Sequence, residues 1–245
     1  MKHRLLVGLL AAFVVLDLAL TFWQNYQLPL DGDLVAIVFP APWYSQVLRD
    51  PFGWAVLTKH EMYGATNRFF AHATMSLYWK TIPLLLQRVA SPISSLYAAS
   101  ALFTTATHAL LVFMLAMYIR QTTGKMSGSW SVWVAAALIV PLFQTEGFNE
   151  QMGVTNRAVT YTSFYAFPMA LVLVLLWPFY RAACQQQPLR LSLWRALLLI
   201  GLMVVIAFNG TIATASIAVV LFCIAVQWTW EQVRATTNRI ERHQG

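Results

Sequence analysis

The sequence Leu30-Asp31-Gly32-Asp33 follows closely on the first long apolar segment of the chain. Residues 5–23, which precede it, carry a single ionisable residue, Asp17, and reach the length of about 20 residues that a helix needs to cross a bilayer. The glycine between Asp31 and Asp33 leaves the backbone free to turn sharply there. The sequence therefore predicts a membrane-spanning helix that brings two carboxylates to the surface of the bilayer.

The composition extends this prediction to the whole chain. Of the 245 residues, 59% are hydrophobic and only 10% are charged, whereas an ordinary soluble domain is about 25% charged. We predict an all-α, polytopic membrane helical bundle that forms a single integral membrane domain over residues 1–245. About six transmembrane helices are expected, at residues 5–23, 96–119, 130–143, 161–180, 193–208 and 212–230.

A long connection, residues 24–96, separates the first two expected spans. Prolines divide it into short pieces, and its many aromatic and aliphatic residues exclude a disordered linker. Tryptophan and tyrosine favour the headgroup level, so we predict short interfacial, or juxtamembrane, helices in this outer loop. Residues 67–89 carry three basic residues and a histidine, and we expect an interfacial helix there because a lipid-exposed crossing with these residues is costly.

The basic residues set the expected orientation. With the N-terminus in the cytoplasm, ten of the sixteen lysines and arginines lie in short cytoplasmic flanks, the side that the positive-inside rule favours. These residues are Lys2, Arg4, Arg120, Lys125, Arg181, Arg190, Arg195, Arg234, Arg239 and Arg242. We therefore expect a bacterial inner (plasma) membrane protein with both termini in the cytoplasm and a basic cytoplasmic tail at residues 231–245.

The same distribution decides between two kinds of partner. A net charge of +7 is compatible with nucleic-acid binding, but here the charges border apolar spans, which indicates contact with anionic lipid headgroups. We expect the lipid bilayer as a partner and no nucleic acid. In the expected orientation six of the nine acidic residues face the outside, in two separate loops: Asp31, Asp33, Asp50, Glu61, Glu146 and Glu150.

Three interpretations of Asp31 and Asp33 stay open from the residues alone. The pair is compatible with a plain surface turn. It is also compatible with a site for one divalent cation, Mg²⁺ or Mn²⁺, since hard cations prefer oxygen ligands. In the third interpretation, one carboxylate takes a proton from an acceptor hydroxyl while the other orients that hydroxyl.

Three stretches of the chain resemble the GT-C glycosyltransferases, polytopic enzymes that use a polyprenyl-phosphate sugar donor. These stretches are the Asp31-Gly32-Asp33 turn, Asn67-Arg68-Phe69-Phe70 and residues 146–165. Over residues 5–180 the chain is similar to bacterial GT-C-like membrane proteins of unassigned function. The resemblance implies a GT-C-like fold and a catalytic carboxylate in the first outer loop. This chain is shorter than most GT-C enzymes.

The resemblance also implies roles for individual residues. Asp31 or Asp33 would be the general base, with or without a metal ion. Arg68 would bind the donor phosphate or would instead be a structural partner of a nearby acid, and His72 would face the site if its helix lies flat in the interface. Glu146 or Glu150 would bind sugar hydroxyls or supply a second carboxylate, with a solvated loop as the alternative.

Two other functions compete with sugar transfer. The short chain is compatible with a non-enzymatic membrane subunit, or a degenerate GT-C-like scaffold, bound to a protein partner in a larger assembly. A small transporter or flippase is the second alternative, in which Asp17 and His108 are the ionisable candidates inside spans. The absence of a clear internal repeat weakens that alternative.

Overall fold

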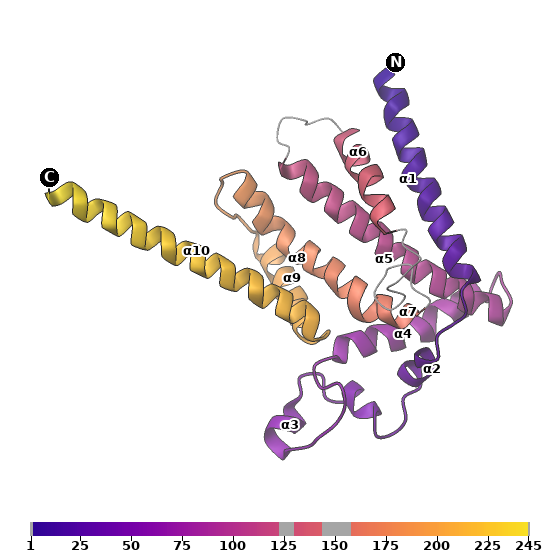
Figure 1. Cartoon of the computed structure of the whole chain (residues 1–245). Helices are drawn as coiled ribbons and strands as arrows, with labels where there is room; N and C mark the ends of the chain where they lie inside the picture. The colour runs from indigo at the N-terminus through magenta and orange to yellow at the C-terminus, as the bar shows by residue number, and fades with distance from the viewer. Residues whose placement is uncertain (1, 123–129, 144–157, 245) are drawn as a thin grey trace.

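The protein is all-α over residues 2–122, 130–143 and 158–244, which the computed structural model describes, with side chains between residues 4 and 234 (Figure 1). Within these ranges, four helices are long and apolar enough to cross a membrane. Their apolar parts are Arg4–Gln27, Pro92–Thr122, Val159–Cys184 and Thr211–Arg234. An all-α protein with membrane-spanning helices is therefore confirmed, at the level of helix length and composition.

Two of the six expected spans are shorter than the others. Helix α6 (Trp130–Ile139), continued by the 3-10 turn η2 (Val140–Leu142), and helix α9 (Leu193–Ala207) are apolar but have fewer than 18 residues. At about 1.5 Å per residue, a helix of this length falls short of the roughly 30 Å of a bilayer core. Of the six expected spans, four correspond to helices that are long enough to cross a membrane.

Helix α5 (Pro92–Thr122) is the centre of the bundle. It packs against α1 (Lys2–Gln27) and α6, and alanines on α5 and α6 let those two backbones approach closely. The buried residues of this contact are Val14, Val112, Ala116, Ala135, Ala136, Ile139 and Val140. The outward faces of α1 expose leucines and phenylalanines, which is the pattern expected of a lipid-facing helix.

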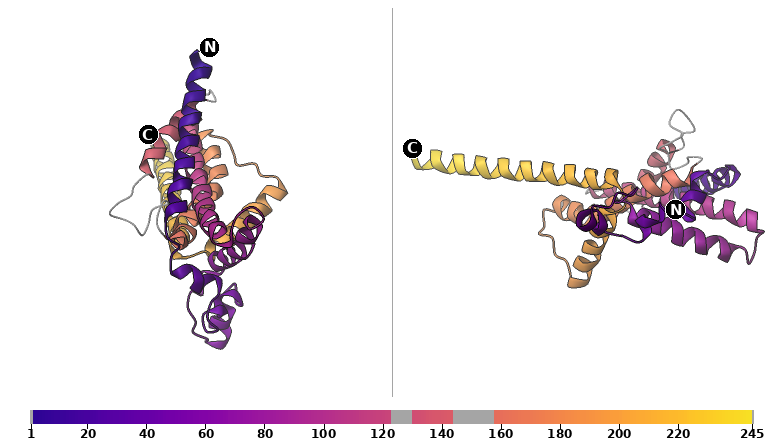
Figure 2. Two further views of the ribbon diagram at one scale, coloured as in Figure 1. Left: turned by 90° about the vertical axis from the view of Figure 1, so that its right-hand side faces the viewer. Right: turned by 90° about the horizontal axis from the view of Figure 1, so that it is seen from below.

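A second group of helices joins α5 from its other side. Helix α8 (Phe167–Cys184) runs beside α5, and the Tyr118 hydroxyl donates a hydrogen bond of 2.8 Å to the Leu173 carbonyl. Helices α9 and α10 (Thr211–Gln244) pack on α8 through a small apolar cluster that includes Leu175 and Ile206. Beyond that cluster α10 projects away from the bundle (Figure 2), and only 6% of its apolar stretch is buried.

The long connection forms short helices, as its prolines predict. These are α2 (Asp33–Val38), η1 (Ser45–Leu48), α3 (Trp54–Lys59) and the longer α4 (Phe69–Leu86), which together we call the outer layer. Figure 1 shows this layer at the end of the molecule opposite the N-terminus. Met75 and Trp79 of α4 pack with α2 and α5 in one buried cluster. Helix α4 is not among the helices that could cross a membrane in the described residues.

Asp50 holds the loop around α3 together. Its carboxylate accepts hydrogen bonds from the Trp54 and Ala55 amides, at 2.9 and 2.8 Å, and from the Tyr63 hydroxyl, at 2.8 Å. Burial acts to raise the pKa of Asp50, but these hydrogen bonds outweigh it and the pKa is lowered. Asp50 therefore caps the start of α3, and its ionised form stabilises this part of the outer layer.

Candidate functional site

Asp31 links the first outer loop to the segment that begins α7 (Val159–Tyr161). One carboxylate oxygen accepts a hydrogen bond from the amide of Leu34 at 2.9 Å, and this bond caps α2. The other oxygen accepts the amide of Thr160 at 3.2 Å. Both oxygens of Asp31 therefore serve helix N-termini, where a carboxylate satisfies amides that have no partner within the helix. The observed contacts give Asp31 a structural role in joining these two segments.

Asp33 has different surroundings. It is the first residue of α2, its side chain is exposed, and it accepts no hydrogen bond from the described residues. Its charge nevertheless acts on the Tyr44 hydroxyl, as does the charge of Arg68. Burial is the main cause of the raised pKa of Tyr44; Arg68 lowers this pKa and Asp33 raises it. The charges of Asp33 and Arg68 thus both act on one half-buried tyrosine.

A hydrogen-bonded chain connects that tyrosine to α4. The Tyr44 hydroxyl lies 2.8 Å from Nε2 of His72, and Nδ1 of His72 lies 2.9 Å from the backbone carbonyl of Arg68. Because a carbonyl only accepts, Nδ1 must carry the proton, and the tyrosine hydroxyl donates to Nε2. The His72 side chain is 1% exposed. This chain fixes the neutral tautomer of His72 and the orientation of Tyr44.

Arg68 lies where three parts of the chain meet. It immediately precedes α4, and its guanidinium stands over the Phe164 ring, 5.7 Å from the ring centre. A side-chain carbon built on Gly210, in the turn between α9 and α10, would come within 4.0 Å of Arg68 Nε. The amide of Phe70 donates to the Phe208 carbonyl at 3.0 Å and fixes this junction. We call Asp33, Tyr44, Arg68, His72 and Phe164 the Arg68 cluster.

Buried polar side chains on two segments beside the cluster have no hydrogen-bond partner among the described residues. They are both side-chain atoms of Asn209 and the hydroxyls of Thr160 and Ser163, in residues that are at most 2% exposed. Leaving such a group without a partner costs about 1–3 kcal/mol. Groups of this kind are normally satisfied by water or a ligand, and Ser163 and Asn209 directly precede Phe164 and Gly210, which lie next to Arg68.

The backbone next to Arg68 is also irregular. Phe164 belongs to η3 (Thr162–Ala166), a π-helical segment between α7 and α8. π-Helical turns are rare and often occur at functional sites, because the extra residue changes the direction of the neighbouring side chains. Here the turn contains Ser163 and Phe164, so the segment that contacts Arg68 is the one that departs from regular geometry.

The structure brings together some of the predicted site residues. Asp33, Arg68 and His72 belong to the Arg68 cluster, and Asp31 is attached beside it through Thr160. Figure 1 shows α2, α4 and α7 gathered at this end of the bundle. Glu146 and Glu150 lie outside the described residues.

The described residues do not fit a dedicated metal site. Within them there is no group of three or more histidine, cysteine, aspartate or glutamate side chains that could hold a metal ion. Asp31 directs both oxygens to backbone amides, and Asp33 supplies one carboxylate where Mg²⁺ or Mn²⁺ needs several oxygen ligands. We therefore assign no chemical step to a divalent cation.

In comparisons with protein-family models, with curated proteins and with solved structures, no match to this chain was found. The resemblance to GT-C enzymes consequently rests on the motifs quoted above and stays a prediction. Any function must therefore be inferred from the contacts of the Arg68 cluster.

Sequence reasoning did not single out three residues of this region. Tyr44 was one of many aromatic residues in the connection, and nothing in its local pattern indicates a partner. Phe164 was part of a motif stretch but without a role, and Asn209 resembled an ordinary turn residue. The available signal was the loop composition: each of these residues lies in or beside a segment that combines polar and aromatic residues next to an apolar span.

Acidification is expected to destabilise the outer layer through His72. Burial lowers the pKa of His72 from its ordinary value; the hydrogen bond to the Arg68 carbonyl opposes this shift, and the Arg68 charge adds to it. An unfolded histidine takes up a proton near pH 6.5, whereas the folded one resists. Stability is therefore full above about pH 6.5 and decreases as the pH falls from there toward the folded pKa.

Thermal unfolding between about pH 5 and 8 measures this effect. The wild type should lose unfolding temperature on the acid side, and His72→Gln should lose much less, because the titrating group is gone. His60→Gln is the matched control, since His60 is exposed, and it should follow the wild type. Equal acid sensitivity in wild type and His72→Gln would contradict the assignment.

Proposed function

We propose that this protein is a membrane glycosyltransferase that transfers a sugar from a polyprenyl-phosphate donor to an acceptor hydroxyl at the extracytoplasmic face. The observation that carries the proposal is the Arg68 cluster, in which a guanidinium and a carboxylate both act on the tyrosine of one tyrosine–histidine pair. A guanidinium suits phosphate oxygens because its fork of N–H donors matches their geometry. The short helices of the outer layer would hold this fork at the depth of a lipid phosphate.

The proposed step uses two residues of the cluster. Arg68 binds the donor phosphate, and Asp33 accepts the proton of the acceptor hydroxyl as its oxygen bonds to the anomeric carbon of the sugar. The bond between that carbon and the phosphate oxygen breaks, and polyprenyl phosphate leaves as an anion stabilised by Arg68. Asp33 supports the base role because it accepts no hydrogen bond from the described residues, whereas Asp31 accepts two.

Two further features support a lipid-linked sugar. The partnerless groups of Ser163 and Asn209 are buried beside Arg68 and would match sugar hydroxyls, which both donate and accept. Trp43 is 74% exposed and packs edge-on against Tyr44, with ring centres 5.5 Å apart. An exposed tryptophan next to the cluster offers an apolar contact for a prenyl chain at the headgroup level.

Transfer from a radiolabelled donor tests the proposal. The full chain is reconstituted into liposomes with polyprenyl-phosphate hexoses and an extract of bacterial envelope acceptors. Movement of label from the lipid phase into acceptor would support the proposal if Asp33→Asn with Arg68→Gln abolishes it. Label that stays in the lipid phase with folded wild-type protein, across the hexoses, would overturn it.

One observation favours a second candidate, the non-enzymatic subunit. Only 6% of the apolar stretch of α10 is buried, and the exposed side chains of this helix include Phe222, Trp228 and Trp230. Lipid chains and an apolar face of a protein subunit would both pack against this apolar surface. Purification from native membranes in mild detergent decides: a partner in fixed ratio, together with no label transfer, would select the subunit function.

A further inference from the structure

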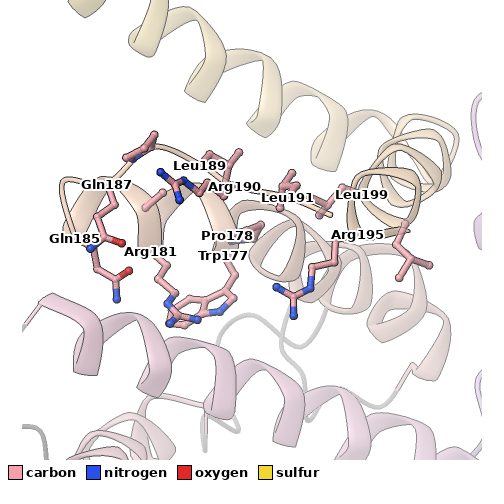
Figure 3. A pocket seen from close by; sticks show the side chains of 13 residues that line it. Trp177, Pro178, Arg181, Gln185, Gln187, Leu189, Arg190, Leu191, Arg195 and Leu199 are labelled. Atoms are coloured by element: carbon pink, nitrogen blue, oxygen red, sulfur yellow. The ribbon is translucent and has the colours of Figure 1, made fainter. Parts of the chain in front are cut away.

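An open cavity of about 840 Å³ lies beside the end of α8 (Figure 3). Figure 1 shows this end of α8 away from the outer layer. The last turn of α8, the loop that follows and the first turn of α9 border the cavity. This volume is within the range of about 300–1,000 Å³ that small-molecule sites occupy. The cavity is independent of the outer layer, so its function is separate from the proposed sugar transfer.

Three arginines from three parts of the chain line the cavity. Arg181 belongs to α8, Arg190 to the loop and Arg195 to α9, and no acidic residue is among the lining residues. None of the three makes an ion pair with the described residues. In Figure 3 the side chains of Arg181 and Arg195 extend to the same side of the loop, whereas the side chain of Arg190 lies on the other side, near Gln187 and Leu189. All three arginines are exposed, so water screens part of their repulsion, and a bound anion would relieve the rest.

The start of α9 adds further positive potential. The residue that precedes it, Ser192, makes no side-chain capping hydrogen bond, and the first turn holds no acidic residue. The first amides of a helix therefore face the region of the arginines without a side-chain acceptor, and they favour a negatively charged group. Arginine forks and helix amides are both donors that suit phosphate oxygens.

The other lining residues are mostly apolar, with two glutamines, Gln185 and Gln187, among them. The apolar ones include Trp177, Leu191, Leu198 and Leu199, and the two last belong to the apolar helix α9. A free phosphate needs no such wall, whereas the glycerol and acyl regions of a phospholipid do. A basic half joined to an apolar half thus matches an anionic lipid better than a small soluble anion.

Aromatic residues give the depth of the cavity in a membrane. Trp177 packs against Tyr118, with ring centres 5.3 Å apart, and Tyr180 packs against Tyr118 at 4.5 Å. Tryptophan and tyrosine gather where the hydrocarbon core meets the headgroups. Because Trp177 and Arg181 are four residues apart on one helix, they lie on the same face, and the arginine reaches the headgroup level.

We propose that this cavity binds an anionic phospholipid, with the headgroup phosphate held by Arg181 and Arg195, Arg190 adding to the positive potential of the loop, and the acyl region against Leu198 and Leu199. Basic pockets between transmembrane helices recognise lipid phosphates in this way. The lipid occupies the space between α8 and α9 and offsets part of the positive charge.

Native mass spectrometry of the full chain in neutral detergent tests the proposal. The probes are phosphatidylglycerol and phosphatidylcholine with identical acyl chains. We expect the wild type to retain phosphatidylglycerol preferentially, and the triple variant Arg181→Gln, Arg190→Gln, Arg195→Gln to lose about 100-fold in its affinity for that lipid, with phosphatidylcholine unaffected. The matched control replaces Arg49, Lys59 and Arg88, three exposed cations of the outer layer and the turn after it, by glutamine.

The outcomes separate a built site from general surface charge. An unchanged lipid preference in the triple variant, or an equal loss in the control, would overturn the proposal. Inorganic phosphate that displaces the lipid at equal concentration would assign the cavity to a free anion instead. A second triple variant with lysine at the three positions retains the charge and should keep most of the preference, which distinguishes loss of binding from loss of the fold.

Discussion

Arg68→Gln is expected to weaken the binding of a polyprenyl phosphate by about 10- to 100-fold, because hydrogen bonds to a charged group contribute about 1.5–3 kcal/mol. Binding of the corresponding polyprenol, which lacks the phosphate, should change little. Tryptophan fluorescence titration of the purified protein in nanodiscs measures both affinities, and Trp43 beside the cluster is a natural reporter. The difference between the two lipids isolates the contribution of the guanidinium to phosphate binding.

The Arg68 side chain can be removed without breaking the chain of hydrogen bonds beside it. His72 bonds to the backbone carbonyl of Arg68, which the variant retains. The contact over Phe164 is lost and contributes about 0.5–2 kcal/mol, so Arg68→Lys serves as a second variant that keeps the charge. Arg49→Gln is the matched control, since Arg49 is an exposed arginine of the same outer layer. Equal affinity for polyprenyl phosphate in wild type and Arg68→Gln would contradict the phosphate role.

The membrane character of the protein was predictable because it depends on the lengths of apolar runs. Residues 5–23 and 96–119 have the length and composition of spans, and the structure extends both to helices, Lys2–Gln27 and Pro92–Thr122. Apolar composition alone does not fix helix length. Helix α9 ends at Ala207, one residue before the end of the expected span, and the turn that follows contains Gly210 with a positive φ of 138°.

The different surroundings of Asp31 and Asp33 were not predictable from their spacing in the sequence. One partner of Asp31 is the nearby amide of Leu34, but the second partner is the amide of Thr160. That contact joins segments more than a hundred residues apart, and no local pattern contains it. The sequence therefore left two equivalent acids, and tertiary structure gives Asp31 two amide partners and leaves Asp33 exposed.

The same reasoning applies to the arginines at the other end of the bundle. Arg181, Arg190 and Arg195 were predicted as orienting charges, and in the sequence they are spread over the flanks of two spans. The loop between α8 and α9 folds them around one cavity. Charge content predicts which end of a membrane protein is basic, whereas the route of the connecting loop decides whether the charges form a site.

Asp33→Asn is expected to reduce sugar transfer by about 10²–10⁴-fold, the range that a positioned general base contributes, while donor binding stays near that of the wild type. The measurement is the rate of label transfer in liposomes under saturating donor, together with the polyprenyl phosphate affinity. Asp31→Ala should show the reverse pattern, because loss of a helix cap costs about 0.5–2 kcal/mol and lowers the unfolding temperature. Glu61→Gln, at an exposed acid of the same layer, should change neither. Undiminished transfer in Asp33→Asn would exclude Asp33 as the base.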